Sequence, residues 1–440
     1  FSPFREKYNR IANLDVAPGF TGVAVVTPGQ TGPYSGTFPN ALINPDKNNF
    51  APRTGFAWRP IPQGKLQIRG GYGIHYNGSI YNQFPTRLAS QPPFANTATL
   101  TTSTAAPLTL QNGFPLSRSS TITNTYAIDR NYLTGYAQTW NLTVQRELPH
   151  AVTVEVGYLG TKGTRLDIQR LPNRAAPGSP LTAEQRRQIG NAVGFTYESA
   201  EGNSIYHAGQ VRVSRRYRKG ISANALYTYS KSIDNASTFG GGGATVAQND
   251  KDLHAERGLS SFDRRHTLSM FYLLSTPSSR GGGTLRADSF LGRLLMDWNF
   301  SGGVTAQAGQ PFTARVLGNQ SNSGGTGSVG SGRADSTGET IDAGSGFFNL
   351  AAFGIPPADR FGNAGRNTIL GPGLFSLNTS VSRSFRLDER RRIEFRAESS
   401  NFTNHPAFTG INTVVNASNY GLATATGPMR NISFNLRFRF

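Results

Sequence analysis

Paired runs of alternating apolar and polar residues are the feature that most constrains the fold of this chain. Four such runs occupy residues 53–76, 142–158, 210–230 and 374–402, and each reverses once at a short segment containing Gly, Pro or Asp. A period of two indicates a β-strand with two chemically different faces. Two such strands joined by a tight turn are typical of a β-hairpin. The sequence therefore predicts an all-β, antiparallel fold.

The segments between the hairpins are long and rich in Gly, Ser, Thr and Asn. They cover residues 77–133, 162–205, 233–262, 317–372 and 403–427, and residues 318–338 have nearly pure linker composition. A compact soluble domain rarely contains structureless loops of this length. A transmembrane β-barrel instead joins its strands by short periplasmic turns at one end and long extracellular loops at the other. The alternation of short turns with long loops favours such a barrel.

About twelve strands can be placed on this plan, with the last one ending on the side of the short turns. They are expected near residues 5–16, 51–59, 65–76, 134–147, 151–161, 206–217, 221–232, 264–275, 294–307, 373–386, 391–402 and 428–440. One connection fits less well, because residues 276–293 are longer than the other turns.

The alternation in the final strand alone does not distinguish a soluble sandwich from a membrane barrel. Ile432, Phe434, Leu436 and Phe438 alternate with polar or basic residues, and the chain stops at Phe440. In a soluble sandwich the apolar row would face a core, and in a membrane barrel it would face lipid. A single strand of this kind is more often half-buried in a soluble sheet. Repeated hairpins with long loops favour the barrel, because a sandwich has shorter connections.

Composition excludes several other classes of protein. There are 44 basic and 25 acidic residues, a net charge of +19, but the basic residues are spread along strands, so no nucleic-acid partner is expected. The chain has no cysteine and therefore no disulfide or thiolate metal site. No run approaches the roughly 18 apolar residues that a transmembrane helix needs.

No catalytic constellation is present, so we predict neither an enzyme nor a metal site or cofactor. The six histidines show no paired ligand spacing, and no GxSxG nucleophile motif occurs. His254 and His266 lie near acidic residues, where a structural hydrogen bond is the expected role. The GxxG spacing in residues 361–367 lacks the strand–turn–helix context of a phosphate-binding loop, and we expect a turn that leads back into a strand.

The alternation assigns the strand residues to two faces. Residues predicted to face the lumen are Arg69, Glu155, Arg212, Arg216, Glu394, Arg396, Glu398, Arg437 and Arg439. Residues predicted to face lipid or to form an aromatic girdle are Trp58, Tyr72, Tyr158, Tyr227, Tyr229, Phe395 and Phe438. The lumen charges would solvate the interior and contact a plug, or they would steer an anionic solute. Arg146, Arg215 and Arg383 fall on the lipid side, close enough to short turns to reach the interface.

Several stretches together resemble TonB-dependent receptors of the Oar-like type, which are common in Acidobacteria and related gram-negative bacteria. The matching stretches are residues 48–77, 204–234, 260–277, 361–373 and 392–408, followed by the aromatic terminal strand. The resemblance implies an outer-membrane barrel of about 22 strands, a plug inside it, and often a regulatory-like domain before it. It also implies import of a bulky solute, of the siderophore, glycan or peptide class, energised by the TonB complex.

The chain departs from that plan in having about twelve strands, no plug-like segment and no TonB box. We therefore expect residues 1–440 to be the C-terminal part of such a barrel, forming an open curved sheet or a narrower barrel. Its expected partners are outer-membrane lipid, the barrel-assembly machinery and, through the N-terminal part, the TonB complex. The alternatives are a passive porin, a secretion-associated barrel and a secreted soluble β-rich adhesin.

Phe440 is predicted to be part of the signal that the assembly machinery recognises, a role implied by the resemblance. Deleting Phe440 from the full-length protein should impair insertion in cells far more than refolding in detergent. Deleting Gly324, in a loop, should impair neither. Equal losses in cells and in detergent would mean that the terminal residue contributes to stability instead of recognition.

Overall fold

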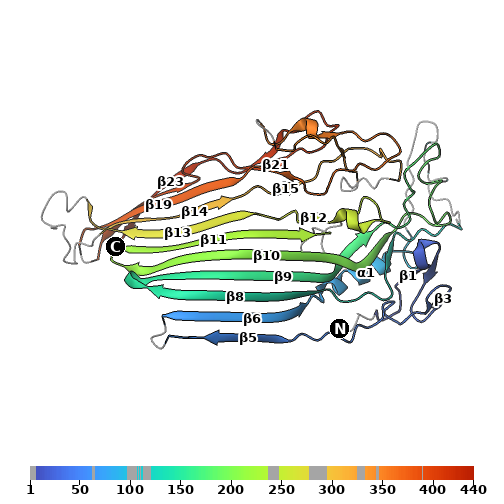
Figure 1. Cartoon of the computed structure of the whole chain (residues 1–440), viewed down its shortest axis with the longest axis horizontal. Coiled ribbons are helices and arrows are strands. Elements are labelled where there is room, and N and C mark those ends of the chain that lie inside the picture. Colours follow the sequence, from blue (N-terminus) through green and yellow to red (C-terminus); the bar gives the residue numbers. More distant parts are fainter. Residues whose placement is uncertain are drawn as a thin grey trace.

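The computed structural model describes residues 6–61, 65–96, 107, 109, 111, 120–235, 247–276, 295–324, 332–342, 346–388 and 390–440. Within these residues the chain forms one large sheet of 13 strands, shown in Figure 1. Its main path runs in the order β23-β20-β19-β14-β13-β11-β10-β9-β8-β6-β5, and every neighbouring pair on it is antiparallel. The strands of the path are β5 (Arg53–Trp58), β6 (Leu66–Tyr76), β8 (Tyr136–Leu148), β9 (Val152–Arg170), β10 (Thr196–Arg218), β11 (Ile221–Asp234), β13 (His266–Ser275), β14 (Trp298–Gln307), β19 (Leu374–Arg386), β20 (Arg392–Ser400) and β23 (Asn431–Arg439).

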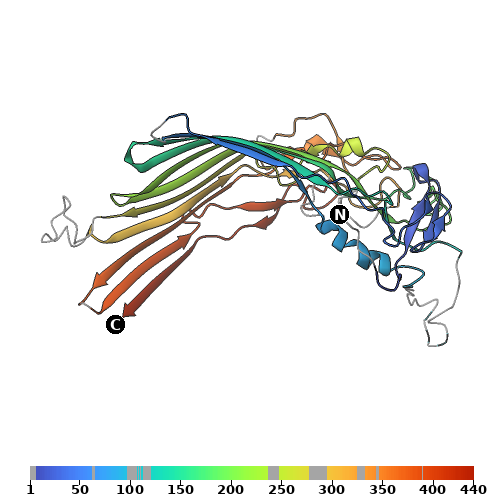
Figure 2. The same ribbon diagram turned by 90° about the horizontal axis from the view of Figure 1, so that it is seen from below.

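The large sheet is curved and open. Figure 2 shows it as an arch, with the C-terminal strands at one side and the N-terminal strands at the other. Among the described residues β5 pairs only with β6, and β23 pairs only with β20, so the two ends of the path do not meet. This is the open, curved antiparallel sheet expected from the sequence.

One predicted strand does not belong to the large sheet. Residue 5 lies outside the described residues, and β1 (Asn13–Val16) pairs instead with β2 (Val23–Val26) in a separate hairpin. The prediction for residues 5–16 was therefore wrong. The physical reason is local pairing and burial, because Leu14 is 2% exposed and the Asn13 side chain donates to the Ile128 carbonyl at 2.9 Å. The long connection before β14 lies largely outside the described residues.

The short turns gather at one end of the sheet, which we call the turn end. β10 and β11 are joined by Lys219 and Gly220 alone, with φ values of 50° and 77°. Positive φ at both central residues is the condition for a type I′ hairpin, whose twist matches that of the strands. A side chain at Gly220 would also collide with the carbonyl of Ser275, so this turn requires glycine.

The opposite end, which we call the loop end, carries a folded layer, although the sequence suggested linker-like loops. Its short strands are β3 (Thr31–Gly32), β4 (Gly36–Thr37), β7 (Tyr126–Ile128), β12 (Gly258–Leu259), β15 (Pro311–Phe312), β16 (Asp335–Ser336), β17 (Phe353–Gly354), β18 (Ile369–Leu370), β21 (Phe408–Ile411) and β22 (Ala423–Thr426). Its helices are η1 (Pro18–Phe20), η2 (Ser79–Asn82), α1 (Phe84–Ala89), η5 (Leu253–Glu256) and η6 (Leu350–Ala352), whereas η3 (Pro149–Ala151) is the turn between β8 and β9. No helix in the described ranges is long and apolar enough to span a membrane.

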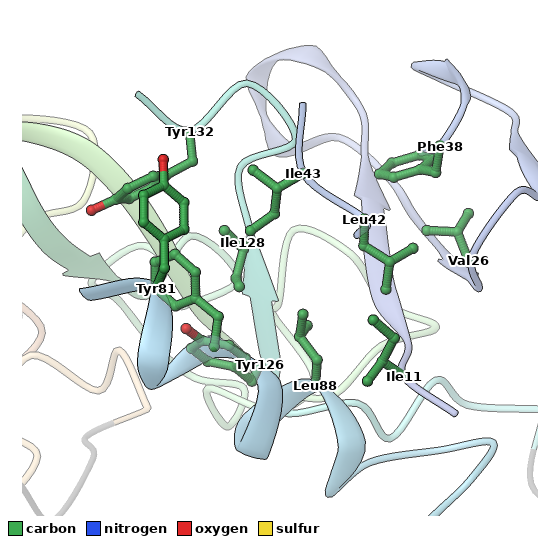
Figure 3. Packing of buried hydrophobic residues seen from close by; sticks show 11 residues of the cluster. Ile11, Val26, Phe38, Leu42, Ile43, Tyr81, Leu88, Tyr126, Ile128 and Tyr132 are labelled. Atoms are coloured by element: carbon green, nitrogen blue, oxygen red, sulfur yellow. The ribbon is translucent and has the colours of Figure 1, made fainter. Parts of the chain in front are cut away.

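Most of the buried apolar residues lie in this loop layer. Figure 3 shows the largest cluster, in which side chains of α1 and β7 pack with Ile11, with Val26 at the end of β2 and with residues 38–43. Its members are Ile11, Val26, Phe38, Leu42, Ile43, Tyr81, Phe84, Leu88, Tyr126, Ile128 and Tyr132. A second cluster combines Ala314, Ala334, Phe348, Ala352, Phe353, Ala364 and Ile369. The long connections therefore have cores of their own, because apolar residues widely spaced in the sequence meet there.

Two buried tyrosine hydroxyls of the first cluster donate to carboxylates on β9 and β10. The Tyr126 hydroxyl donates to Glu198 at 3.0 Å, and the Tyr132 hydroxyl donates to Asp167 at 3.1 Å. Burial, reinforced by the neighbouring carboxylates, raises the pKa of both tyrosines. Both hydroxyls therefore stay protonated and remain donors, which ties the loop layer to the far ends of β9 and β10.

A buried ionic network joins two connections that are distant in sequence. Arg366, from the predicted turn at residues 361–367, forms an ion pair with Asp234 at 2.5 Å and donates to the Glu256 carbonyl. Glu256 in turn pairs with Arg333. These side chains are at most 7% exposed. The sequence predicts only a turn at residues 361–367. It does not predict the ion pair of Arg366, because the partner is remote in the sequence.

We predict that Arg366→Ala loosens the loop layer without dissolving the sheet. Removing one partner of a buried pair leaves a carboxylate in a poorly solvated site, which costs about 3–5 kcal/mol. Amide hydrogen exchange in detergent should show lost protection at residues 230–234 and 258–260. The matched control is Arg391→Ala, whose pair with Asp388 is exposed and is worth at most about 1 kcal/mol. Equal exchange in both variants would show that the network does not hold the layer.

Candidate functional site

The register of the large sheet separates its side chains into two faces. Directly opposed residues point to the same side, so one row can be followed across neighbouring strands. One row consists of Trp58, Ile68, Val144, Val156, Val211, Tyr227, Leu268, Ala306 and Phe375. We call the side that contains this row the apolar face and the opposite side the polar face.

Within the described residues, no other part of the chain covers the apolar face. Val156 is 53% exposed, Trp58 is 58% exposed, and Leu436 on β23 is 75% exposed. Soluble monomers rarely leave a continuous apolar surface of this extent in water. The core of the molecule lies in the loop layer, so this face has no partner within the described residues.

The register groups the residues that the sequence singled out. Trp58, Tyr72, Tyr158, Tyr227, Tyr229, Phe395 and Phe438 all lie on the apolar face. Arg69, Glu155, Arg212, Glu394, Arg396, Glu398, Arg437 and Arg439 lie on the polar face. Arg216 follows the irregular end of β10 and contacts Glu147 of the polar face at 3.4 Å. The residues of each predicted set are therefore brought together on one side.

Ion pairs on the polar face link neighbouring strands. Arg69 on β6 contacts Glu155 on β9 at 3.0 Å and donates to Gln145 on the intervening β8 at 2.8 Å. Both charged side chains are partly exposed, so the pair adds little stability. Its main effect is to fix the arginine over β8.

A second charged group lines a groove at the turn end of β19, β20 and β23. Glu394 lies between Arg392 at 3.4 Å and Arg439 at 3.2 Å, and Arg396 contacts Glu398 at 3.3 Å. The groove has a volume of about 790 Å³ and is lined mainly by polar-face side chains, including Asn299, Ser382, Asn435 and Arg437. A hollow lined by charges indicates that this side of the sheet is suited to water.

The polar face carries excess positive charge. Glu147, Glu155, Glu394 and Glu398 each have an arginine partner. Arg212 and Arg437 have no ion pair within the described part of the chain. Two guanidinium groups are therefore available to an anion at this face.

Both margins of the apolar face are amphipathic. Toward the loop end, the Tyr158 hydroxyl lies 2.7 Å from Nδ1 of His207, and the Tyr227 hydroxyl lies 2.7 Å from Nδ1 of His266. Toward the turn end, the Arg383 guanidinium stacks over Trp298 at 5.4 Å and over Phe385 at 4.6 Å. Aromatic rings with a polar handle are typical of the two boundaries of a membrane.

Two features of these faces were missed in the sequence. His207 and His266 stand on the apolar face, and only the register shows that they meet tyrosines of other strands. Phe271 lies on the polar face, is 66% exposed and covers Gly303 of β14. Residues 266–275 contain apolar residues at both odd and even positions. The sequence pattern therefore could not predict that Phe271 lies on the polar face. Among the described residues, no group of three His, Asp or Glu could hold a metal ion.

Solved structures of outer-membrane proteins are similar to this chain over much of its length. The transporter YddB of Escherichia coli is 12% identical, with a TM-score of 0.48 and coverage of 89% of this chain and 41% of its own. Pseudomonas aeruginosa FpvA, solved with pyoverdines bound, is 9% identical, with a TM-score of 0.42 and coverage of 90% and 33%. The chain thus spans well under half the length of these proteins. No curated protein sequence matches it.

The match to a protein family identifies the class of the molecule. A family model described as an outer membrane beta barrel domain matches residues 1–433, nearly the whole chain. The two-faced antiparallel sheet is the structural form of that description, so the chain is a component of the outer membrane and not an enzyme. The chain belongs to the family of outer membrane beta barrel domains.

Proposed function

We propose that this chain forms part of the wall of a TonB-dependent receptor of the Oar-like type, which imports a bulky solute. The observation that carries the proposal is the segregation of charge across one sheet. From the turn end up to Lys162 and Lys231, the described strands place no Asp or Glu on the apolar face. We infer that the apolar face contacts lipid and that the polar face lines a water-filled lumen.

The three arginines on the apolar face fit this assignment. Arg146, Arg215 and Arg383 all lie near the turn end, close to where β8, β10 and β19 stop. An arginine costs about 2–4 kcal/mol at the bilayer midplane and about 0–1 kcal/mol near the interface. Their placement therefore supports a membrane boundary at the turn end.

The open ends of the sheet support a barrel larger than this path. The unpaired backbone groups of β5 and β23 have no water to bond within hydrocarbon, and each would cost several kcal/mol. We propose that further strands of the receptor pair with both edges and complete a barrel of about 22 strands, the size at which the lumen is wide enough to hold a plug. Energy would reach that plug from the TonB complex through the N-terminal part of the protein.

The solute class follows from the inner surface of the proposed barrel. A wide lumen admits siderophores, glycans or peptides, and an excess of cations favours a solute that carries negative charge. Arg212 and Arg437 would attract such a solute without first breaking an ion pair. The paired charges would contact the plug and keep the wall hydrated.

The lipid and water assignments can be tested with spin labels on the full-length protein in bilayers. Labels at Val154, Tyr227 and Phe395 should respond to a lipid-soluble quencher, because they replace apolar-face residues. Labels at the adjacent Glu155, Thr228 and Glu394 should respond to an aqueous quencher. If neighbouring positions report the same medium, the two-faced membrane wall is wrong, and a soluble β-rich adhesin becomes the better explanation.

Passive and energised transport can be separated by conductance. The full-length receptor in a planar bilayer should show no steady open channel, because a plug would close the lumen. A passive porin would conduct at once. In cells, a growth advantage that depends on the receptor should disappear when tonB is deleted. Retention of that advantage without TonB would refute energised uptake, whatever the spin labels report.

A further inference from the structure

Every ionised side chain on the membrane portion of the apolar face is basic. Arginines stand near the turn end, as described above, and Lys162 and Lys231 stand toward the loop end. The distance along β9 from Val152 to the level of Lys162 is about 33 Å, at roughly 3.3 Å per residue. For tilted strands this matches an apolar band about 25 Å tall. The lysines therefore stand where the outer leaflet would place its headgroups.

Lys231 and two histidines are neighbours across three strands at the loop end. Lys231 on β11 lies directly opposite His207 on β10, and Tyr229, two residues away, lies opposite His266 on β13. Lys231 is exposed and makes no hydrogen bond or ion pair with the described residues. When Tyr158 and Tyr227 donate to Nδ1 of the two histidines, each imidazole carries its proton on Nε2 and becomes a donor itself.

Two further basic residues, Lys162 and Arg257, form no ion pair with the described residues. Lys162 on β9 is half-buried, and the register leads from it across β10 and β11 to Leu259 of β12, two residues after Arg257. Within the described residues, the Lys162 ammonium has one hydrogen-bond partner, the Asn203 side-chain oxygen at 3.3 Å. Glu201, a nearby carboxylate on β10, is engaged by Arg170 at 2.7 Å. Like charges on the same partly desolvated surface are unfavourable, and a bound anion relieves that cost.

We propose that Lys162, His207, Lys231, Arg257 and His266 form a binding site for the phosphorylated headgroup of an outer-leaflet lipid. We call this set the basic rim. The proposal rests on the lipid contact of the apolar face proposed above, and it adds a specific lipid partner to the transport function. A phosphate monoester can accept hydrogen bonds from several of these groups at once and can neutralise the positive charges of Lys162, Lys231 and Arg257.

A lipid fits this site better than a free anion, because the rim continues into exposed apolar side chains. Val156, Val211 and Tyr227 lie on the same face, nearer to the turn end, and are between 39% and 53% exposed. Acyl chains would lie along these residues while the headgroup binds the rim. Two of the three arginines near the turn end are less available, since Arg383 is stacked on two rings and Arg215 donates to the Arg218 carbonyl.

The test is native mass spectrometry of the full-length protein titrated with diphosphoryl lipid A in detergent. The wild type should retain this lipid and should bind phosphatidylcholine at least tenfold more weakly. The double variant Lys162→Gln/Lys231→Gln should lose at least tenfold in apparent affinity for lipid A and little for phosphatidylcholine. The matched control, Lys47→Gln/Lys251→Gln, removes two exposed lysines outside the rim and should bind like the wild type.

Three outcomes would overturn the proposal. The first is equal lipid A affinity in the rim variant and the wild type. The second is the same loss in the control variant, which would mean general attraction by net charge. The third is displacement of lipid A by millimolar inorganic phosphate, which would mean that the rim recognises the anion and not the lipid. Spin-label and conductance results do not depend on Lys162 or Lys231, so failure here is distinguishable from failure of the transport proposal.

Discussion

The hydrogen-bonded register that runs from β5 to β23 is the interaction on which the rest of the structure depends. Because side chains alternate with a period of two, a slip of one residue in any pair would turn a whole strand over. Arg69 would then point away from Glu155, and Val156 would leave the row that contains Val211. Both the paired charges of one face and the continuous apolar surface of the other therefore require the same register in every pair.

Much of the sheet could be predicted because the alternation within a strand and the turn that follows it are both visible in short stretches of sequence. In β11 the apolar residues Ala223, Ala225 and Tyr227 recur at every second position, with Leu226 as the apolar exception between them, and a two-residue turn fixes where the strand begins. The family match accordingly agrees with the fold class and the outer-membrane location that the sequence suggested. Local pattern failed at residues 5–16, where a short apolar run could pair with its neighbour or with the sheet. The resemblance to one receptor subtype remains an interpretation of the sequence.

The loop layer could not be predicted, because its contacts join residues that are remote in the sequence. Arg366 and Asp234 are 132 positions apart, and no periodicity relates them. Composition was misleading as well, since Gly, Ser and Asn are common both in flexible linkers and in tightly turning, well-packed connections. The cluster around Tyr126 and Tyr132 distinguishes a packed connection from a flexible linker, because a few large side chains spaced among small ones are enough to form a core. The far ends of β9 and β10 contact this core, because Asp167 and Glu198 accept hydrogen bonds from its tyrosines.

The positive charge of the chain has a structural explanation once its distribution is known. On the polar face arginines outnumber their glutamate partners, and on the apolar face the charged residues are all basic and stand at the margins. Long cationic side chains tolerate a membrane boundary because the charged end can reach water or phosphate while the stem stays in the apolar layer. A carboxylate has a shorter stem and would be repelled by anionic headgroups. The excess of lysine and arginine therefore suits a wall between lipid and water, and nucleic acid is not needed to account for it.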